Sequence, residues 1–152
     1  MNASDSTEQA ALQNLQQHVL AMPMAQTLGL RFTKLARGAV ELEIPVAEAF
    51  TFRPGQLQAT PVFAIADFAA VSAAGSLLPA GWVNATVDTT LKLLAPARGA
   101  RLRARGRVVD AGRLLTVCAA DVYAVSVAGE ERLCATLLAT ARNVEVAKAT
   151  AS

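Results

Sequence analysis

Hydrophobic residues follow two contrasting patterns along this chain, and the first is a long uniform run. Residues 60–79 (TPVFAIADFAAVSAAGSLLP) are apolar on nearly every side of a helix, and Asp67 is their only ionisable residue. Thr60 can accept hydrogen bonds from the free amides of a helix N-terminus, Pro61 suits the first helical position, and Pro79 ends the run. A helix that is apolar all round is normally enclosed by its domain. The run therefore predicts a central helix, with Asp67 in its second turn.

The second pattern is alternation with a period of two, which is typical of half-buried strands. It is clearest in residues 40–44, where Val40, Leu42 and Ile44 alternate with two glutamates. Residues 83–94 carry an apolar face and a polar face, and residues 101–107 place an arginine at every odd position. These runs and three others predict strands at 28–36, 40–44, 83–94, 101–110, 114–127 and 133–144.

The remaining segments complete the expected order of elements. Ser6 and Gln9 have the spacing of a capping box, and an apolar stripe continues from there to Pro23, which predicts an N-terminal helix. Residues 46–59 are expected to form a loop. The order is then helix, two strands, buried helix and four strands in a meander. Such an order predicts an α+β domain with a mainly antiparallel sheet.

Length and composition narrow the class of protein. The chain has 152 residues, of which 53% are hydrophobic, and this suits one domain with a sizeable core rather than a disordered chain. The net charge of +2 gives no signal for nucleic acid. The N-terminus lacks the features of a secretory signal, and residues 61–78 are mostly alanine, include Asp67 and lack aromatic or basic flanks. We therefore expect a soluble cytoplasmic protein that does not bind membranes. Residues 1–5 and the end of the chain from Glu145 are expected to be loose tails.

Asp67 is the most promising chemical group, because a carboxylate inside an apolar helix is costly unless it is paired, hydrogen-bonded or hydrated. The other candidates are weaker. Cys118 and Cys134 lie in apolar strands without metal-ligand spacing, so we expect buried, inert thiols and no metal. The only histidine, His18, is expected to be a surface or hydrogen-bonded residue of the first helix. The sequence contains no G-x-S-x-G motif and no phosphate-binding loop.

Three motifs, in this order of elements, resemble the hotdog-fold thioesterases, in particular the phenylacetate-degradation type (PaaI-like) of small acyl-CoA thioesterase. They are LGL at 28–30, AIAD at 64–67 and TVDTTLKLLAPA at 86–97. The resemblance covers roughly residues 23–143 and implies an antiparallel sheet wrapped around a long central helix. It divides the chain into an N-terminal tail and helix (1–22), a hotdog thioesterase-like domain (23–144) and a tail (145–152).

The resemblance also implies roles for single residues. Asp67 falls on the family's catalytic carboxylate, and Thr86 falls on a Ser or Thr that helps to hold the nucleophilic water; Thr90 is a weaker candidate for that task. Where the family has His-Gly-Gly before the carboxylate, this chain has Gln58, Ala59 and Thr60. Gln58 would polarise the thioester carbonyl, and the backbone amides of Ala59 and Thr60 would bind the oxyanion. An Asn that some members place fifteen residues before the carboxylate is Phe52 here.

Substrate and partners follow from the same resemblance. The expected reaction is hydrolysis of a short-chain, medium-chain or aryl acyl-CoA, with coenzyme A as part of the substrate and no further cofactor. Arg98, Arg101 and Arg103 would hold its phosphates, although a solvated strand face explains the odd-numbered arginines more simply. Phe50, Phe52, Phe63, Phe68 and Trp82 would line an acyl tunnel or fill the core. Hotdog sites form between subunits, so a dimer or tetramer is expected, with Gln58 reaching Asp67 from the partner. The alternative is a non-catalytic acyl-CoA or small-ligand binding protein.

Overall fold

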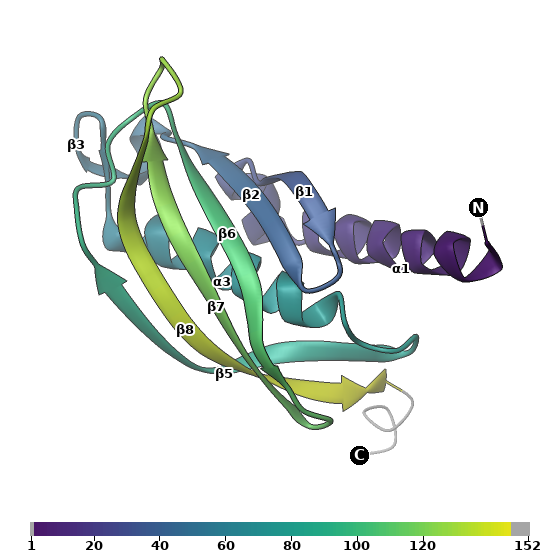
Figure 1. Ribbon diagram of the computed structural model, residues 1–152. Coiled ribbons are helices and arrows are strands. Elements are labelled where there is room, and N and C mark those ends of the chain that lie inside the picture. The colour runs from purple at the N-terminus through teal and green to yellow at the C-terminus, as the bar shows by residue number, and fades with distance from the viewer. Residues whose placement is uncertain (1, 147–152) are drawn as a thin grey trace.

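The computed structural model describes residues 2–146, and its centre is the long helix α3 (Ala59–Gly75). A six-stranded antiparallel sheet curls around this helix, as Figure 1 shows. The expected α+β architecture, a sheet wrapped around one buried helix, is therefore confirmed. The strands of the sheet are β1 (Arg31–Ala36), β2 (Ala39–Pro45), β5 (Trp82–Leu93), β6 (Arg101–Ala111), β7 (Leu115–Val125) and β8 (Glu131–Glu145).

The order of strands in the sheet is β1-β2-β6-β7-β8-β5. Only β6, β7 and β8 form the expected meander, because β5 pairs with β8 at the far edge instead of lying beside β6. The prediction of a four-strand meander was therefore wrong. The long connection from β5 to β6 crosses to the other side of the β7–β8 pair, and β5 is left as an edge strand of twelve residues.

Small residues allow α3 to lie very close to the sheet. Its buried face is rich in alanine, and it packs on strands that are themselves rich in alanine. The closest approach is at Gly106 of β6, where an added Cβ would lie 2.1 Å from the carbonyl oxygen of Ala69. The alanine content of residues 60–79 is thus explained by packing, since larger side chains would push the helix away from the strands.

The boundaries of α3 differ from the expected ones. The helix begins at Ala59, its N-cap is Gln58 without a side-chain capping bond, and it ends at Gly75, well before Pro79. Thr60 is therefore the second helical residue and not the cap. Asp67 is the ninth residue, which places it in the third turn and not in the second.

The N-terminal half contains more helix than the alternation predicted. The first helix, α1 (Ala3–Leu20), starts before the Ser6–Gln9 capping box, inside the tail expected at residues 1–5. A short helix, α2 (Pro23–Leu28), precedes the first strand, which begins at Arg31 and not at Leu28; the helix is capped by Gly29, whose φ of 69° suits glycine. The expected loop 46–59 contains a 3₁₀ turn (Glu48–Phe50) and a small hairpin of β3 (Thr51–Arg53) and β4 (Gln56–Leu57).

The two ends of the chain complete the picture. The outer half of α1 projects beyond the sheet in Figure 1. Of the tail expected from Glu145, residue 145 is still part of β8, and residues 147–152 lie outside the described residues. None of the helices within residues 2–146 is long and apolar enough to cross a membrane.

Candidate functional site

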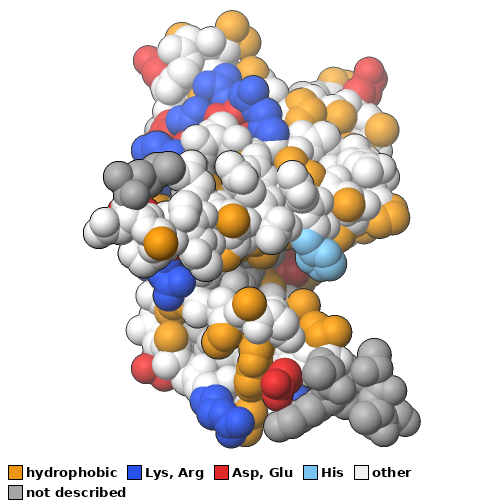
Figure 2. Space-filling model, turned by 90° about the vertical axis from the view of Figure 1, so that its right-hand side faces the viewer, with side chains coloured by type: hydrophobic (Ala, Val, Ile, Leu, Met, Phe, Trp, Pro, Cys, Tyr) orange, Lys and Arg blue, Asp and Glu red, His pale blue; other side chains and the backbone are white. Residues whose placement is uncertain are grey.

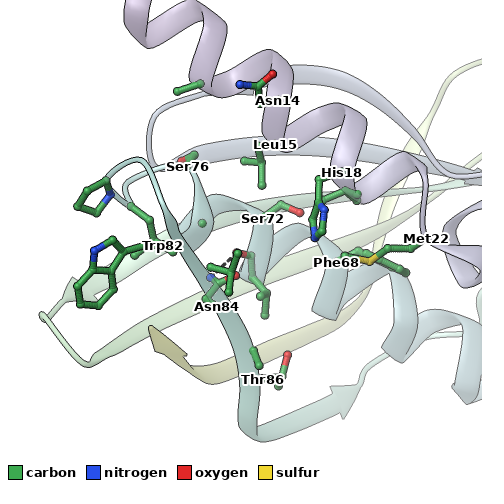
Figure 3. Close-up of a pocket in the computed structure, with 18 of the residues that line it drawn as sticks. Asn14, Leu15, His18, Met22, Phe68, Ser72, Ser76, Trp82, Asn84 and Thr86 are labelled. Atoms are coloured by element: carbon green, nitrogen blue, oxygen red, sulfur yellow. Dashed lines mark hydrogen bonds between the residues drawn. The ribbon is translucent and has the colours of Figure 1, made fainter. Parts of the chain in front are cut away.

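A cavity of about 480 Å³ lies between α1, α3 and β5, and Asp67 is part of its wall. Each element contributes side chains at its own period. The α3 positions form two i, i+4 series, 67, 71, 75 and 68, 72, 76, and β5 contributes residues 82–86, of which the alternate residues Trp82, Asn84 and Thr86 are the half-buried ones (Figure 3). The side chains from α3 are Asp67, Phe68, Val71 and Ser72, with Ser76 from its C-cap; those from β5 include Trp82, Asn84 and Thr86; those from α1 include Asn14, Leu15, His18 and Val19, and Met22 follows α1.

Asp67 and Thr86 meet in this cavity. The hydroxyl of Thr86 donates a hydrogen bond to Asp67, with Oγ1 and Oδ1 2.8 Å apart. The Asp67 side chain is half-buried, and burial raises the pKa of its carboxyl while the hydrogen bond from Thr86 lowers it, so that the net shift is upward. Two residues that the sequence nominated separately, nineteen positions apart, are thus brought together. The result is a carboxylate with one hydroxyl partner and a free side toward the cavity.

The polar face of β5 is the face that turns inward here. Asn84 and Thr86 are half-buried, and the amide of Asn84 donates to the carbonyl oxygen of Val71 at 3.0 Å, which ties β5 to α3. The apolar alternate residues Val83 and Val87 are 43% and 55% exposed. A register shift after Thr86 ends this arrangement, so Thr90 is exposed and does not line the cavity. Thr86 is therefore the threonine that the geometry favours.

The residues that were expected to bind the oxyanion lie away from the cavity in the same chain. Gln58 caps α3, and Ala59 and Thr60 are its first two residues; all three are exposed, and none lines the cavity. Nine residues of helix separate Gln58 from Asp67, which is roughly 13 Å at the usual rise per residue. The structure of one chain therefore does not bring these residues to Asp67.

The arginines fall into two groups. Arg101 and Arg103 lie on the outer face of the sheet, where both donate to Oε1 of Glu43, at 3.3 and 2.9 Å from their Nε atoms. Glu43 is 1% exposed, and the hydrogen bonds from Arg103 and Arg31 outweigh its burial, so its pKa is lowered. Arg98 lies beside the β3–β4 hairpin instead. Its Nε donates to Oε1 of Gln56 at 2.9 Å.

The aromatic residues and cysteines are also divided. Phe68 and Trp82 line the cavity, whereas Phe50 and Phe63 pack against the core and Phe52 is exposed. Both cysteines are buried, as expected. Burial, together with the nearby charge of Asp67, raises the pKa of Cys118 to about 11, so this thiol stays neutral. Among residues 2–146, no three His, Cys, Asp or Glu side chains are grouped closely enough to hold a metal ion.

His18 is exposed on the first helix, as expected for a surface residue, and it also lines the cavity. It lies in the last turn of α1, on the side of the helix that faces α3, and Figure 3 shows its ring near Phe68 and Ser72. A sequence signal existed, because His18 follows Leu15 by three residues and Asn14 by four, which places all three on one helical face. Nothing in the sequence, however, indicated that this face would cover Asp67.

Comparisons with known proteins give a consistent result. A model of the thioesterase superfamily matches residues 62–129, the part that contains Asp67 and Thr86. The crystal structure of a thioesterase family protein from Silicibacter pomeroyi is 38% identical; the match covers 88% of this chain and 97% of that one, with a TM-score of 0.84.

Two more distant structures share the fold. A thioesterase from Haemophilus influenzae is 21% identical, covering 89% of this chain and 91% of that one with a TM-score of 0.76. The PaaI protein of the phenylacetic acid degradation operon of E. coli is 18% identical, covering 90% and 95% with a TM-score of 0.77. Among proteins with curated descriptions, none matches the sequence.

Proposed function

Because this chain belongs to the thioesterase superfamily, we propose that it hydrolyses an acyl-CoA thioester to a free acid and coenzyme A. The observation that supports this proposal most directly is the Asp67–Thr86 pair at the wall of a largely apolar cavity. A raised pKa suits a carboxylate that must accept a proton during turnover. The volume of about 480 Å³ lies in the range of small-molecule sites.

In the proposed reaction, Asp67 acts on a water molecule. The carboxylate accepts a proton from the water while the water oxygen forms a bond to the thioester carbonyl carbon. The carbon–sulfur bond then breaks. Thr86 holds Asp67 in place through its hydroxyl, and its oxygen can accept a hydrogen bond from the same water. Direct attack by the carboxylate on the carbonyl carbon, followed by hydrolysis of the anhydride, would use the same geometry.

The acyl group would occupy the apolar part of the cavity. Phe68, Val71 and Trp82 line it, together with Leu78 and side chains of α1. This lining suits a short-chain, medium-chain or aryl acyl group. Phe50 and Phe63, which pack with the core, are not part of this proposal.

A second copy of the chain would complete the site. The amides of Ala59 and Thr60 and the side chain of Gln58 are too far from Asp67 in one chain, but they are exposed and available to a partner. Within residues 2–146, the strand β5 pairs only with β8, so its other edge offers free backbone groups, and Val83 and Val87 on this strand are exposed and apolar. We therefore propose a dimer or tetramer in which each Asp67 faces donors from the neighbouring chain.

The phosphates of coenzyme A would lie near the β3–β4 hairpin. Arg53 and Arg98 both donate to Oε1 of Gln56, a neutral acceptor, and neither forms an ion pair among the described residues. Two guanidinium groups that converge on an uncharged oxygen suit an anionic ligand. Arg101 and Arg103 suit it less well, because Glu43 already pairs with both.

The test is a thiol-release assay with a panel of acyl-CoA thioesters, run with the wild type and with Asp67→Asn as the matched inactive variant. We expect turnover of at least one short-chain, medium-chain or aryl acyl-CoA by the wild type, and its loss in the variant. Calorimetric binding of the same thioesters without any thiol release would instead identify the non-catalytic binding protein. Turnover that is equal in both forms would contradict the role of Asp67.

A further inference from the structure

We propose that His18 is a further catalytic residue, the acid that donates a proton to the departing thiolate sulfur. This inference rests on the proposed thioester hydrolysis and adds a residue from α1 to it. Asp67 and His18 are the only ionisable residues among those that line the cavity, and they come from different helices. An acid and a base on separate elements of one cavity are what a general acid–base reaction requires.

The ring of His18 is available for this task. No hydrogen bond or ion pair joins it to another residue in the described part of the chain, 2–146. Both His18 and Asp67 line the same cavity, and Figure 3 shows the ring directed into it from α1. A substrate placed between them would meet the carboxylate on one side and the imidazole on the other.

The position of His18 also matches the part of the substrate that leaves. His18 is exposed, and the chain's one histidine, pale blue in Figure 2, lies on the rim of the hollow on that side of the molecule. Val71 and Phe68, in contrast, are half-buried farther inside. An acyl group held by these inner residues would leave the sulfur and the attached pantetheine arm toward the rim. His18 is therefore on the leaving-group side of the scissile bond.

The balanced step is as follows. The oxygen of water forms a bond to the carbonyl carbon, and the proton it loses passes to Asp67. The carbon–sulfur bond breaks with its electron pair on sulfur, and the proton on the His18 ring passes to that sulfur. The proton on Asp67 then returns to His18 through solvent. The net reaction consumes one thioester and one water and yields one acid and one thiol, with no other reactant.

The experiment compares two leaving groups on the same acyl chain. An alkyl thiolate such as that of coenzyme A is more basic than thiophenolate, so a proton donor assists its departure much more. In His18→Gln and His18→Ala we expect kcat on the acyl-CoA to fall about 100-fold. The kcat on the matching thiophenyl ester is expected to stay at the wild-type value. Gln17→Ala is the matched control, because Gln17 is exposed on the same helix and does not line the cavity.

Each other outcome has a definite meaning. Equal loss on both esters would show that His18 only supports the structure or binding, and unchanged kcat on both would show that it has no part in turnover; either result overturns the proposal. A wild type that is inactive on every thioester overturns the proposed function and this inference together. Thermal melting of both His18 variants checks that they are folded, and the two differ in whether they keep a hydrogen-bond donor.

Discussion

An acidic residue lies on each side of the sheet, Glu43 on its outer face and Asp67 on the helix α3 at its inner side, and the two have opposite surroundings. On the outer face, Glu43 is almost fully buried under arginine side chains and accepts from Arg31, Arg101 and Arg103. On the inner side, Asp67 is half-buried in a cavity and has one partner among the described residues, the Thr86 hydroxyl. The pKa of Glu43 is lowered and that of Asp67 is raised.

This difference indicates what each acid contributes. A charge that is surrounded by opposite charges stabilises the folded chain but is not available for chemistry, because it will not accept a proton near neutral pH. A charge with a single neutral partner costs folding free energy, and it keeps its basicity and its exposed oxygen. Two arginines, Arg103 and Arg105, extend the outer network from Glu43 to Glu41 and Glu131.

The largest expected effect is that of Asp67→Asn. Loss of the proton acceptor should lower kcat by about 10²–10⁴-fold. The free energy of unfolding near neutral pH should stay the same or rise. The pKa of Asp67 is raised in the folded state, so its ionised form costs stability once the pH exceeds the unfolded value, and the variant removes that cost. Steady-state kinetics and urea unfolding measure both quantities. A strongly destabilised variant would show that Asp67 has a structural role.

Gly106→Ala should have the largest effect on stability alone. Its Cβ would lie 2.1 Å from the carbonyl oxygen of Ala69, so α3 must move away from β6. Overpacking of this kind costs about 1–3 kcal/mol, and occasionally more. Chemical denaturation measures the loss. Gly75→Ala is the control. Gly75 is the last residue of α3, and a Cβ added there would lie 3.4 Å from the nearest neighbouring atom. Equal stability of the two variants would contradict the close contact between α3 and β6.

These contacts also show why the sequence predicted some features and not others. The period of apolar residues is a local property, so it identified α3, most strands and the lone carboxylate at Asp67. The place of β5 beside β8 depends on a crossover that no local pattern encodes. Residues 83–87 misled for a physical reason, because Val83 and Val87 are exposed there while the polar Asn84 and Thr86 are half-buried at the cavity; the register shift after Thr86 returns Leu91 to the core.

The site residues divide in the same way. The resemblance to a known family predicted roles for Asp67 and Thr86 at one site. In the structure, Oγ1 of Thr86 lies 2.8 Å from Oδ1 of Asp67. His18 lies far from both in the sequence, and only the docking of α1 on α3 brings it to the cavity. The arginines of β6 were read from their alternation, which gave the shared face correctly. Their pairing with Glu41 and Glu43 required knowledge that β2 lies next to β6.

Glu43→Gln should reduce stability while leaving turnover intact. The three arginines lose a charged partner but can reach water, so we expect a loss of about 1–3 kcal/mol. The lowered pKa of Glu43 means that its stabilisation is present above the unfolded value of 4.5 and is lost as the pH falls through the folded value. The difference in stability between wild type and variant should therefore narrow below pH 4.5. Thermal melting from neutral to acidic pH measures this difference. A difference that does not change with pH would mean that the charge of Glu43 is not the cause.

Thr86→Val should have the smallest effect, and it tests how Asp67 is tuned. Without the hydroxyl, the carboxylate loses the one interaction that lowers its pKa, so the pKa should rise further. Asp67 must be ionised to accept a proton, so the acid limb of the kcat/KM profile should move to higher pH, with a loss of about tenfold near neutrality. Thr90→Val is the control, because Thr90 lies beyond the register shift and outside the cavity. An acid limb that stays in place in Thr86→Val while turnover falls would assign Thr86 to holding the water, and not to setting the basicity of Asp67.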